Sequence, residues 1–360
     1  MDKYEKLREI LDASPTGAPK SRAFDEILRI LYSPDEADLA ACMTLFPRPL
    51  EAIAADAGVD PDRAGRMLEA MADRAVVMSR EKDGKRSYGL LPTIPGLFEF
   101  PFMRGALTPE LARLAKLWDE YHRETQGAAF SGNPTPIARV IPVEQSVGTA
   151  THIHPHDEVA RLIDTVDYVA LGNCACRVSV DACDKPREMC LIFDAAGRFL
   201  VSRGFARQIS RKEAHAVLDK AEETGLVHTS NNSADKASFI CNCCSCCCTI
   251  LTCRTRLGLP HAFAESAFQA HIDAGSCTGC GICADDRCPM GAIDASGDTA
   301  VLTPERCIGC GLCVSTCPTG SIGLVRRESP PEVLPTMREM GARVLSEKGK
   351  LEAFLSQMKG

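Results

Sequence analysis

The chain has 360 residues and a formal net charge of −7, and twenty of its residues are cysteines. This length favours two or three domains rather than one core, and the acidic balance argues against a general nucleic-acid-binding surface. No run of eighteen apolar residues predicts a membrane span, and residues 1–6 lack the apolar stretch of a signal peptide, so we expect a reducing, cytoplasmic environment with free thiols.

The first quarter of the chain is predicted to be mostly helical. Apolar residues spaced three and four apart mark amphipathic helices within residues 1–33. Prolines 34, 49 and 61 each open a further helix, and β-rich runs at 75–79 and 86–91 are joined across Asp83-Gly84. This order of helices and hairpin resembles a winged-helix domain, which we place within residues 1–92.

The resemblance to a winged helix implies DNA binding through the third helix, at residues 60–73. Residues 34–92 carry eleven acidic against eight basic residues, and the third helix is itself acidic. Because phosphate contacts supply most of the affinity for DNA, we expect nucleic acid not to be a partner and the domain to dock or support other parts. A redox-sensing winged-helix transcription regulator remains the alternative, with the basic hairpin residues Arg80, Lys82, Lys85 and Arg86 as its phosphate contacts.

Residues 93–137 form a proline-rich linker around one helix, from Thr108 to about Tyr121. Just before this helix lies an apolar group, Phe98, Phe100, Phe102 and Met103. Apolar side chains gathered in a linker are typical of a buried contact between domains, which is the role that we expect for them.

Residues 138–270 are predicted to form a cysteine-rich α/β middle domain. An apolar strand at 166–171 leads into Cys174, and Ser210 to Glu213 form a capping box that starts a helix ending at Gly225. Eleven cysteines lie in this domain: Cys174, Cys176, Cys183, Cys190, Cys241, Cys243, Cys244, Cys246, Cys247, Cys248 and Cys253.

Such a density of thiols is not explained by packing, since crowded free thiols oxidise or bind stray metal. Adjacent residues point in different directions, so no single centre can use every thiol of the group at 241–248. We expect one or two further [4Fe–4S] clusters, with ligands drawn from both cysteine groups. A structural zinc ion and a redox-active thiol pair stay open as alternatives, and Cys42 is expected to be a small core residue.

Two cysteine motifs follow within residues 271–328: Cys277-x2-Cys280-x2-Cys283-x4-Cys288-Pro289 and Cys307-x2-Cys310-x2-Cys313-x3-Cys317-Pro318. They resemble the bacterial-type two-[4Fe–4S] ferredoxins, in which each motif lends its fourth cysteine to the neighbouring cluster. The resemblance implies one cluster on Cys277, Cys280, Cys283 and Cys317, and a second on Cys307, Cys310, Cys313 and Cys288. Residues 284–287 are four where the pattern has three; we expect this insertion to bulge outward, which leaves Cys288 the ligand that the pattern fixes least.

Three histidines, His152, His154 and His156, alternate along one stretch, but the following Asp157 and the intervening Pro155 are more typical of a helix start than of a metal site. His228 is expected to be a satisfied buried histidine. Residues 329–360 are predicted to form a C-terminal helix that packs back on the body.

Together these features predict an α+β multidomain protein. Its parts are a winged-helix-like N-terminal domain, a cysteine-rich α/β middle domain and a ferredoxin-like dicluster domain with a helical tail. The whole chain also resembles uncharacterised iron–sulfur proteins of anaerobes.

The sequence contains neither a dinucleotide-binding Gly-x-Gly-x-x-Gly motif after a strand nor a P-loop, so electrons must come from or go to a separate protein. Residues 273–325 hold six acidic residues against Arg287 and Arg306, which predicts a redox partner with a basic docking patch. We therefore expect an iron–sulfur electron-transfer protein or oxidoreductase component. The regulator named above is one alternative, and a structural electron-relay subunit of a larger redox complex is another.

Overall fold

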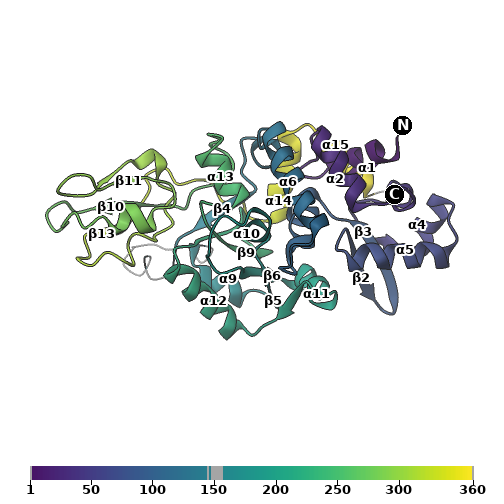
Figure 1. Cartoon of the computed structure of the whole chain (residues 1–360), viewed down its shortest axis with the longest axis horizontal. Coiled ribbons are helices and arrows are strands. Elements are labelled where there is room, and N and C mark those ends of the chain that lie inside the picture. Colours follow the sequence, from purple (N-terminus) through teal and green to yellow (C-terminus); the bar gives the residue numbers. More distant parts are fainter. Residues whose placement is uncertain (1, 144–145, 147–156, 359–360) are drawn as a thin grey trace.

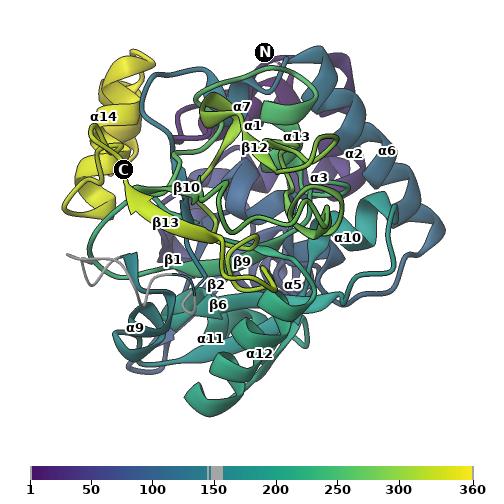
Figure 2. The same cartoon turned by 90° about the vertical axis from the view of Figure 1, so that its left-hand side faces the viewer.

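The computed structural model describes residues 2–143, 146 and 157–358, and it is elongated (Figure 1). The N-terminal region lies at one end, the cysteine-rich region in the centre and the two cysteine motifs at the other end, while the C-terminal helices return to the N-terminal end. Figure 2 views the molecule from the end that carries the two motifs, with β10, β12 and β13 in front. His152, His154 and His156 lie outside the described residues.

The N-terminal region alternates helices with a small antiparallel sheet of order β1-β3-β2. The Ser33 hydroxyl and the Glu36 carboxylate form a capping box, and Asp60 accepts a hydrogen bond from the Arg63 backbone, so both helices begin where the sequence predicts. The elements are α1 (Lys3–Asp12), α2 (Arg22–Leu31), α3 (Pro34–Ala40), β1 (Arg48–Pro49), α4 (Leu50–Ala57), α5 (Pro61–Asp73), β2 (Val77–Lys82) and β3 (Lys85–Leu90).

The linker residues expected at a domain contact are buried there. Phe98, Phe100, Phe102 and Met103 all lie in the core, and the Phe100 ring lies 6.5 Å from that of Phe199 in the middle region. The structured parts of the linker are η1 (Thr93–Leu97), η2 (Phe100–Phe102), α6 (Pro109–Glu124) and α7 (Ala128–Ser131).

The middle region is built on a six-stranded sheet of order β4-β8-β9-β6-β5-β7. It mixes helices and strands as expected, but every ladder in it is antiparallel, unlike the parallel sheets of βαβ units. Its strands are β4 (Ala138–Ile141), β5 (Val169–Asn173), β6 (Glu188–Phe193), β7 (Ala206–Gln208), β8 (Val227–Asn231) and β9 (Phe239–Cys243). Its helices are α9 (Val159–Asp164), α10 (Ala175–Val180), α11 (Asp194–Ser202), α12 (Arg211–Glu223) and α13 (Thr249–Thr255).

The last part of the body, here called the ferredoxin-like segment (268–326), opens and closes on one antiparallel strand pair. This pair is β10 (Phe268–Ile272) with β13 (Ile322–Arg326), so β10 begins just before the boundary expected at residue 271. A second pair, β11 (Ile293–Asp294) and β12 (Val301–Leu302), flanks the hairpin tip expected at 296–298. The short helical turns η4 (Cys283–Arg287) and η5 (Pro304–Arg306) complete the segment.

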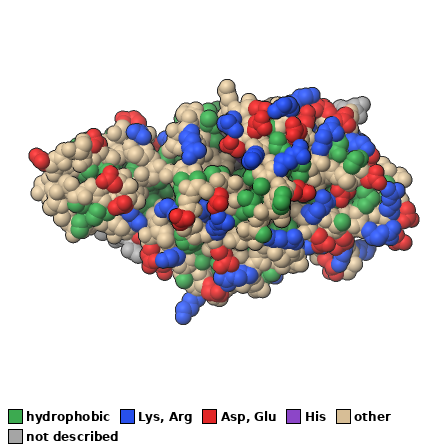
Figure 3. All heavy atoms as spheres, in the orientation of Figure 1, with side chains coloured by type: hydrophobic (Ala, Val, Ile, Leu, Met, Phe, Trp, Pro, Cys, Tyr) green, Lys and Arg blue, Asp and Glu red, His purple; other side chains and the backbone are tan. Residues whose placement is uncertain are grey.

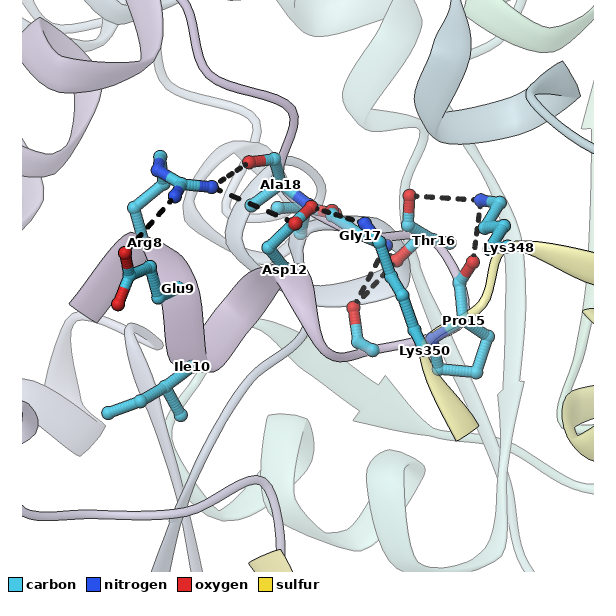
Figure 4. Close-up of polar contacts among 12 residues, drawn as sticks. Arg8, Glu9, Ile10, Asp12, Pro15, Thr16, Gly17, Ala18, Lys348 and Lys350 are labelled. Atoms are coloured by element: carbon cyan, nitrogen blue, oxygen red, sulfur yellow. Dashed lines mark hydrogen bonds and ion pairs between the residues drawn. The ribbon is translucent and has the colours of Figure 1, made fainter. Parts of the chain in front are cut away.

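The C-terminal helices α14 (Met337–Glu347) and α15 (Leu351–Gln357) pack against the N-terminal region, as Figure 4 shows in detail. Lys348 Nζ donates to the carbonyl oxygens of Pro15 (2.7 Å) and Thr16 (3.4 Å), and Lys350 Nζ lies 2.7 Å from Asp12 Oδ1. Across the described residues, no helix is both long and apolar enough to cross a membrane.

Candidate iron–sulfur and thiol–metal sites

The first thiol set of the ferredoxin-like segment surrounds a small cavity at the far end of the molecule. Cys277, Cys280, Cys283 and Cys317 line this cavity, together with the apolar Ile282 and Ile322. The Ala300 backbone N–H donates to Cys277 Sγ at 3.4 Å, and Cys280 is exposed to solvent. Four thiols around an apolar cavity, with an amide aimed at a sulfur, fit a [4Fe–4S] cluster.

The second set lies closer to the middle region, around a second small cavity. It consists of Cys288, Cys307, Cys310 and Cys313, so each motif does contribute its last cysteine to the other set. Burial raises the pKa of the Cys310 thiol to about 12, and the Ala292 N–H donates to Cys288 Sγ at 3.1 Å. A bound metal centre is the natural partner for thiols that water cannot reach.

The four-residue insertion between Cys283 and Cys288 does two things. Asp285 and Asp286 are exposed, as expected for an outward bulge, but Arg287 turns inward and is buried. Its guanidinium donates to the carbonyl oxygens of Leu312 (3.1 Å), Glu223 (3.0 Å) and Glu222 (2.7 Å). The insertion therefore brings Cys288 to its set and ties the segment to the end of α12.

Comparisons with known proteins agree with this geometry. The family model of the 4Fe-4S dicluster domain matches residues 276–321. An uncharacterized ferredoxin of Methanocaldococcus jannaschii is 39% identical over 54 residues, which are 14% of this chain and 86% of that protein. Through this segment, the chain belongs to the ferredoxin family. No solved structure matches the chain.

The family match lies within residues 268–326, which we call the ferredoxin segment from here on. It indicates the general chemistry of the chain. The chain is an iron–sulfur protein of ferredoxin-like electron transfer. A [4Fe–4S] cluster supplies one-electron transfer at a potential set by its hydrogen bonds and solvent exposure. The exposed Cys280 places the outer thiol set at the surface, whereas Cys310 and Cys313 of the inner set are buried.

Ten of the eleven middle-region cysteines fall into two sets, which the sequence alone does not separate. The smaller, here called the four-thiol group, combines the loop before β6 with the turn after β9: Cys183, Cys244, Cys246 and Cys247. Their sulfur atoms all lie within 4.8 Å of one another, with Cys183 Sγ 3.7 Å from that of Cys247 and 4.0 Å from that of Cys244.

These spacings fit one metal ion. With metal–sulfur bonds of about 2.3 Å, a tetrahedral site has sulfur–sulfur edges of about 3.8 Å. Among the described residues, the four-thiol group is the one set of potential ligands drawn together this closely, and neither ferredoxin set is. The zinc alternative from the sequence therefore suits this group better than a cubane does, because a cubane carries its thiolates on four separate irons.

The larger set is a ring of six thiols that includes Cys241 and Cys243 of β9. Each of these thiols shifts the pKa of its neighbours, in the order Cys174, Cys176, Cys248, Cys243, Cys241, Cys190 and back to Cys174. We call this set the six-thiol ring.

Secondary structure builds the six-thiol ring from distant parts of the chain. Cys241 and Cys243 alternate onto one face of β9, and the pairing of Leu191 with Ile240 sets Cys190 of β6 beside Cys241. Cys174 directly follows β5 and precedes α10, while Cys248 directly precedes α13. The thiols of Cys176 and then Cys190 hold the pKa of Cys174 well below its usual range.

One cationic residue that the sequence analysis missed lies between these two sets. Arg177 is almost completely buried; its Nη1 donates to the Asn242 carbonyl at 2.9 Å and lies 3.8 Å from Cys244 Sγ. Burial lowers its pKa, but Cys174 and Cys190 raise it, so that the pKa lies above the ordinary value of a guanidinium. The only sequence signal was an arginine in a short apolar helix, three residues after Cys174.

Three other residues singled out from the sequence take no part in either set. Cys253 is buried beside Gly127, and burial alone raises its pKa to about 11. Cys42 follows α3 and is partly buried. His228 is buried and hydrogen-bonded through Nδ1 to Asn242 Oδ1 at 2.6 Å, which is the satisfied histidine that we expected.

Proposed function

We propose that this protein relays electrons between a partner protein and metal centres in its middle region, with the ferredoxin segment as the connection. The observation that carries the proposal is the direct attachment of the inner thiol set to the middle region. The Val143 N–H donates to the carbonyl of Cys310 at 2.9 Å, and Arg287, next to Cys288, donates to the carbonyls at the end of α12. Two of the four inner ligands are thus held by middle-region backbone.

The end of α12 also contacts the four-thiol group. Lys185, two residues after Cys183, donates to the Thr224 carbonyl, and Leu226 packs in one apolar cluster with Cys244 and Cys247. Backbone and packing therefore connect the outer set, the inner set and the four-thiol group in that order, and Arg177 lies between the four-thiol group and the six-thiol ring. Because the four-thiol group suits a redox-inactive zinc ion, the electron acceptor that we propose is the six-thiol ring.

The partner surface that we propose is acidic. All six acidic residues counted in the segment are exposed, whereas Arg287 is buried and unavailable to a partner. Figure 3 shows acidic side chains and few basic ones over this end of the molecule. A basic patch on the partner would approach the exposed Cys280, and such an acidic face favours fast, salt-sensitive association.

For the N-terminal region we propose a winged-helix type of module that serves docking rather than DNA binding. The order α3-β1-α4-α5-β2-β3 and the sheet order β1-β3-β2 support that assignment. Arg203 of the middle region bonds to Glu69 (3.0 Å) and Asp73 (2.6 Å) of α5, the helix that would enter a DNA groove. Arg86 of the hairpin is paired with Glu69 as well, so the carboxylates of α5 pair with arginines of the protein, and Arg86 pairs with a protein carboxylate instead of a phosphate.

The relay is tested on anaerobically purified protein by following the middle-region absorbance or EPR signals after rapid reduction. We expect Cys317→Ser, which damages the outer set, to slow reduction of the middle centres at least tenfold, while Cys253→Ser leaves the rate unchanged. Equal rates in both variants would contradict the relay. A salt-sensitive gel shift on DNA would instead favour the redox-sensing regulator.

A further inference from the structure

We propose that the six-thiol ring binds one polynuclear iron–sulfur cluster through the thiolates of all six cysteines. The site itself stands on the ring's own geometry, and its role as an electron acceptor rests on the proposed relay.

The first argument is that the ring is closed and rigidly built. The register of β6 with β9 sets Cys190 beside Cys241, and each of the six thiols interacts with two others of the set, so none is a spare thiol at the edge of a smaller site. The ring rests on β5, β6 and β9, and on the first residues of α10 and α13. Ligands fixed by a sheet are positioned without a folding cost on binding.

The second argument is the size of the site. A single tetrahedral ion draws four thiolates to edges of about 3.8 Å, as the neighbouring four-thiol group illustrates. Among the described residues, no three ring cysteines have sulfur atoms that all lie within 4.8 Å of one another. The six sulfurs therefore surround a centre wider than one ion. An ordinary cubane takes four thiolates and would leave two of the six without a metal.

The third argument is charge. Arg177 is about 1% exposed, and no described carboxylate pairs with it; its Nε and Nη2 have no hydrogen-bond partner. A buried guanidinium is costly unless an anion compensates it. It follows Cys176 directly and is drawn to the charge of Cys174 and Cys190. A cluster with six thiolates supplies the negative charge that this cation lacks.

The fourth argument is the surroundings of the sulfurs. The hydroxyl of Thr229 lies 3.5 Å from Cys243 Sγ, and that of Thr249 lies 3.7 Å from Cys176 Sγ. Hydroxyl donors at cluster sulfurs stabilise negative charge there and raise the reduction potential. Cys243 and Cys248 themselves are buried within the main hydrophobic core, which limits access of water.

The test is a metal and sulfide analysis of the full chain purified without oxygen. We expect more than about twelve irons per chain, because the two ferredoxin clusters account for about eight and a third cubane would bring the total only to about twelve. Cys190→Ser and Cys241→Ser lie on one side of the ring, and Cys176→Ser on the other. All three should lose the ring's iron while keeping about eight. Cys253→Ser, a buried thiol outside the ring, is the matched control and should keep the full count.

Three results would overturn the site: about eight irons with zinc in the ring, about twelve irons, or full iron retention in Cys176→Ser and Cys190→Ser. The EPR signals of the two ferredoxin clusters, measured in every variant, show whether the chain still folds. If the ring holds its cluster but that cluster is never reduced through the ferredoxin segment, the proposed relay is wrong and the proposed cluster site is still supported.

Discussion

Replacing Arg177 by methionine removes a buried positive charge without greatly changing side-chain volume. The guanidinium lies 3.8 Å from Cys244 Sγ, and at an effective dielectric constant of about 20 a unit charge at that distance interacts by about 4 kcal/mol. For a one-electron couple this corresponds to about 170 mV, because about 59 mV is equivalent to 1.4 kcal/mol. The loss of the cation disfavours the added electron, so the potential falls. The figure is a ceiling, because Cys244 belongs to the four-thiol group, whereas the redox electron lies in the six-thiol ring. Among the described residues, no ring sulfur is within hydrogen-bond distance of the guanidinium.

The measurement is a potentiometric titration monitored by EPR, with Arg177→Lys as the charge-preserving control. We expect a clearly lower potential for a middle-region centre in the methionine variant, a much smaller change in the lysine variant, and unchanged ferredoxin potentials in both. The Asn242 carbonyl loses its donor in the methionine variant, which costs about 1–3 kcal/mol of stability. A rise in potential, or equal potentials in a methionine variant that keeps its metal, would refute the electrostatic argument.

Three further predictions concern single sites. Cys288→Ser should remove about four irons, because Cys288 completes the inner set, and iron analysis with an unchanged count would exclude it as a ligand. Cys183→Ser should lose one metal ion while the iron–sulfur signals persist; a loss of cluster iron instead would show that the four-thiol group holds a cluster. Burial lowers the pKa of Lys348 to about 8, so protonation is favoured in the unfolded state, and the stability of the docked C-terminal helices should rise between about pH 8 and 10.5. Lys348→Met should abolish this rise in anaerobic denaturation, and a slope equal to that of the parent protein would contradict it.

The ferredoxin segment could be predicted from the sequence because its ligands are set by local spacing. Each Cys-x2-Cys step positions neighbouring sulfurs without help from the rest of the chain, and the hairpin at 296–298 follows from turn residues. The inward turn of Arg287 could not be predicted, because its partners Glu222 and Glu223 lie about 65 residues earlier in the chain. The insertion at 284–287 therefore makes a long-range contact that the spacing of the cysteines does not predict.

In the middle region, by contrast, the local sequence pattern indicates which cysteines are candidate ligands but does not indicate which of them share a site. Alternation along β9 predicts that Cys241 and Cys243 share a face, as they do. Which thiols join them depends on the register between β6 and β9, and this register is a tertiary property. Cys253 has the same local signal as the others, yet it lies in the hydrophobic core, because α13 turns it toward Gly127.

The N-terminal region shows why an order of elements does not settle a function. The three proline-initiated helices and the hairpin could be predicted from caps and turn residues. The acidic character of α5 already weakened the DNA interpretation, but only the structure reveals that Arg203 of the middle region bonds to it. Carboxylates on α5 thus have a partner within the chain.

The position of Arg177 links the two kinds of metal site in the middle region. Arg177 contacts Cys244 of the four-thiol group, and it directly follows Cys176 of the six-thiol ring. Both sets bind through negatively charged thiolates, and one buried cation between them weakens their mutual repulsion. The cation therefore screens the four-thiol group from an electron added to the ring. If so, the methionine variant should show stronger coupling between metal binding in the four-thiol group and the ring potential, with a larger potential difference between protein loaded and unloaded at Cys183 than in the parent protein.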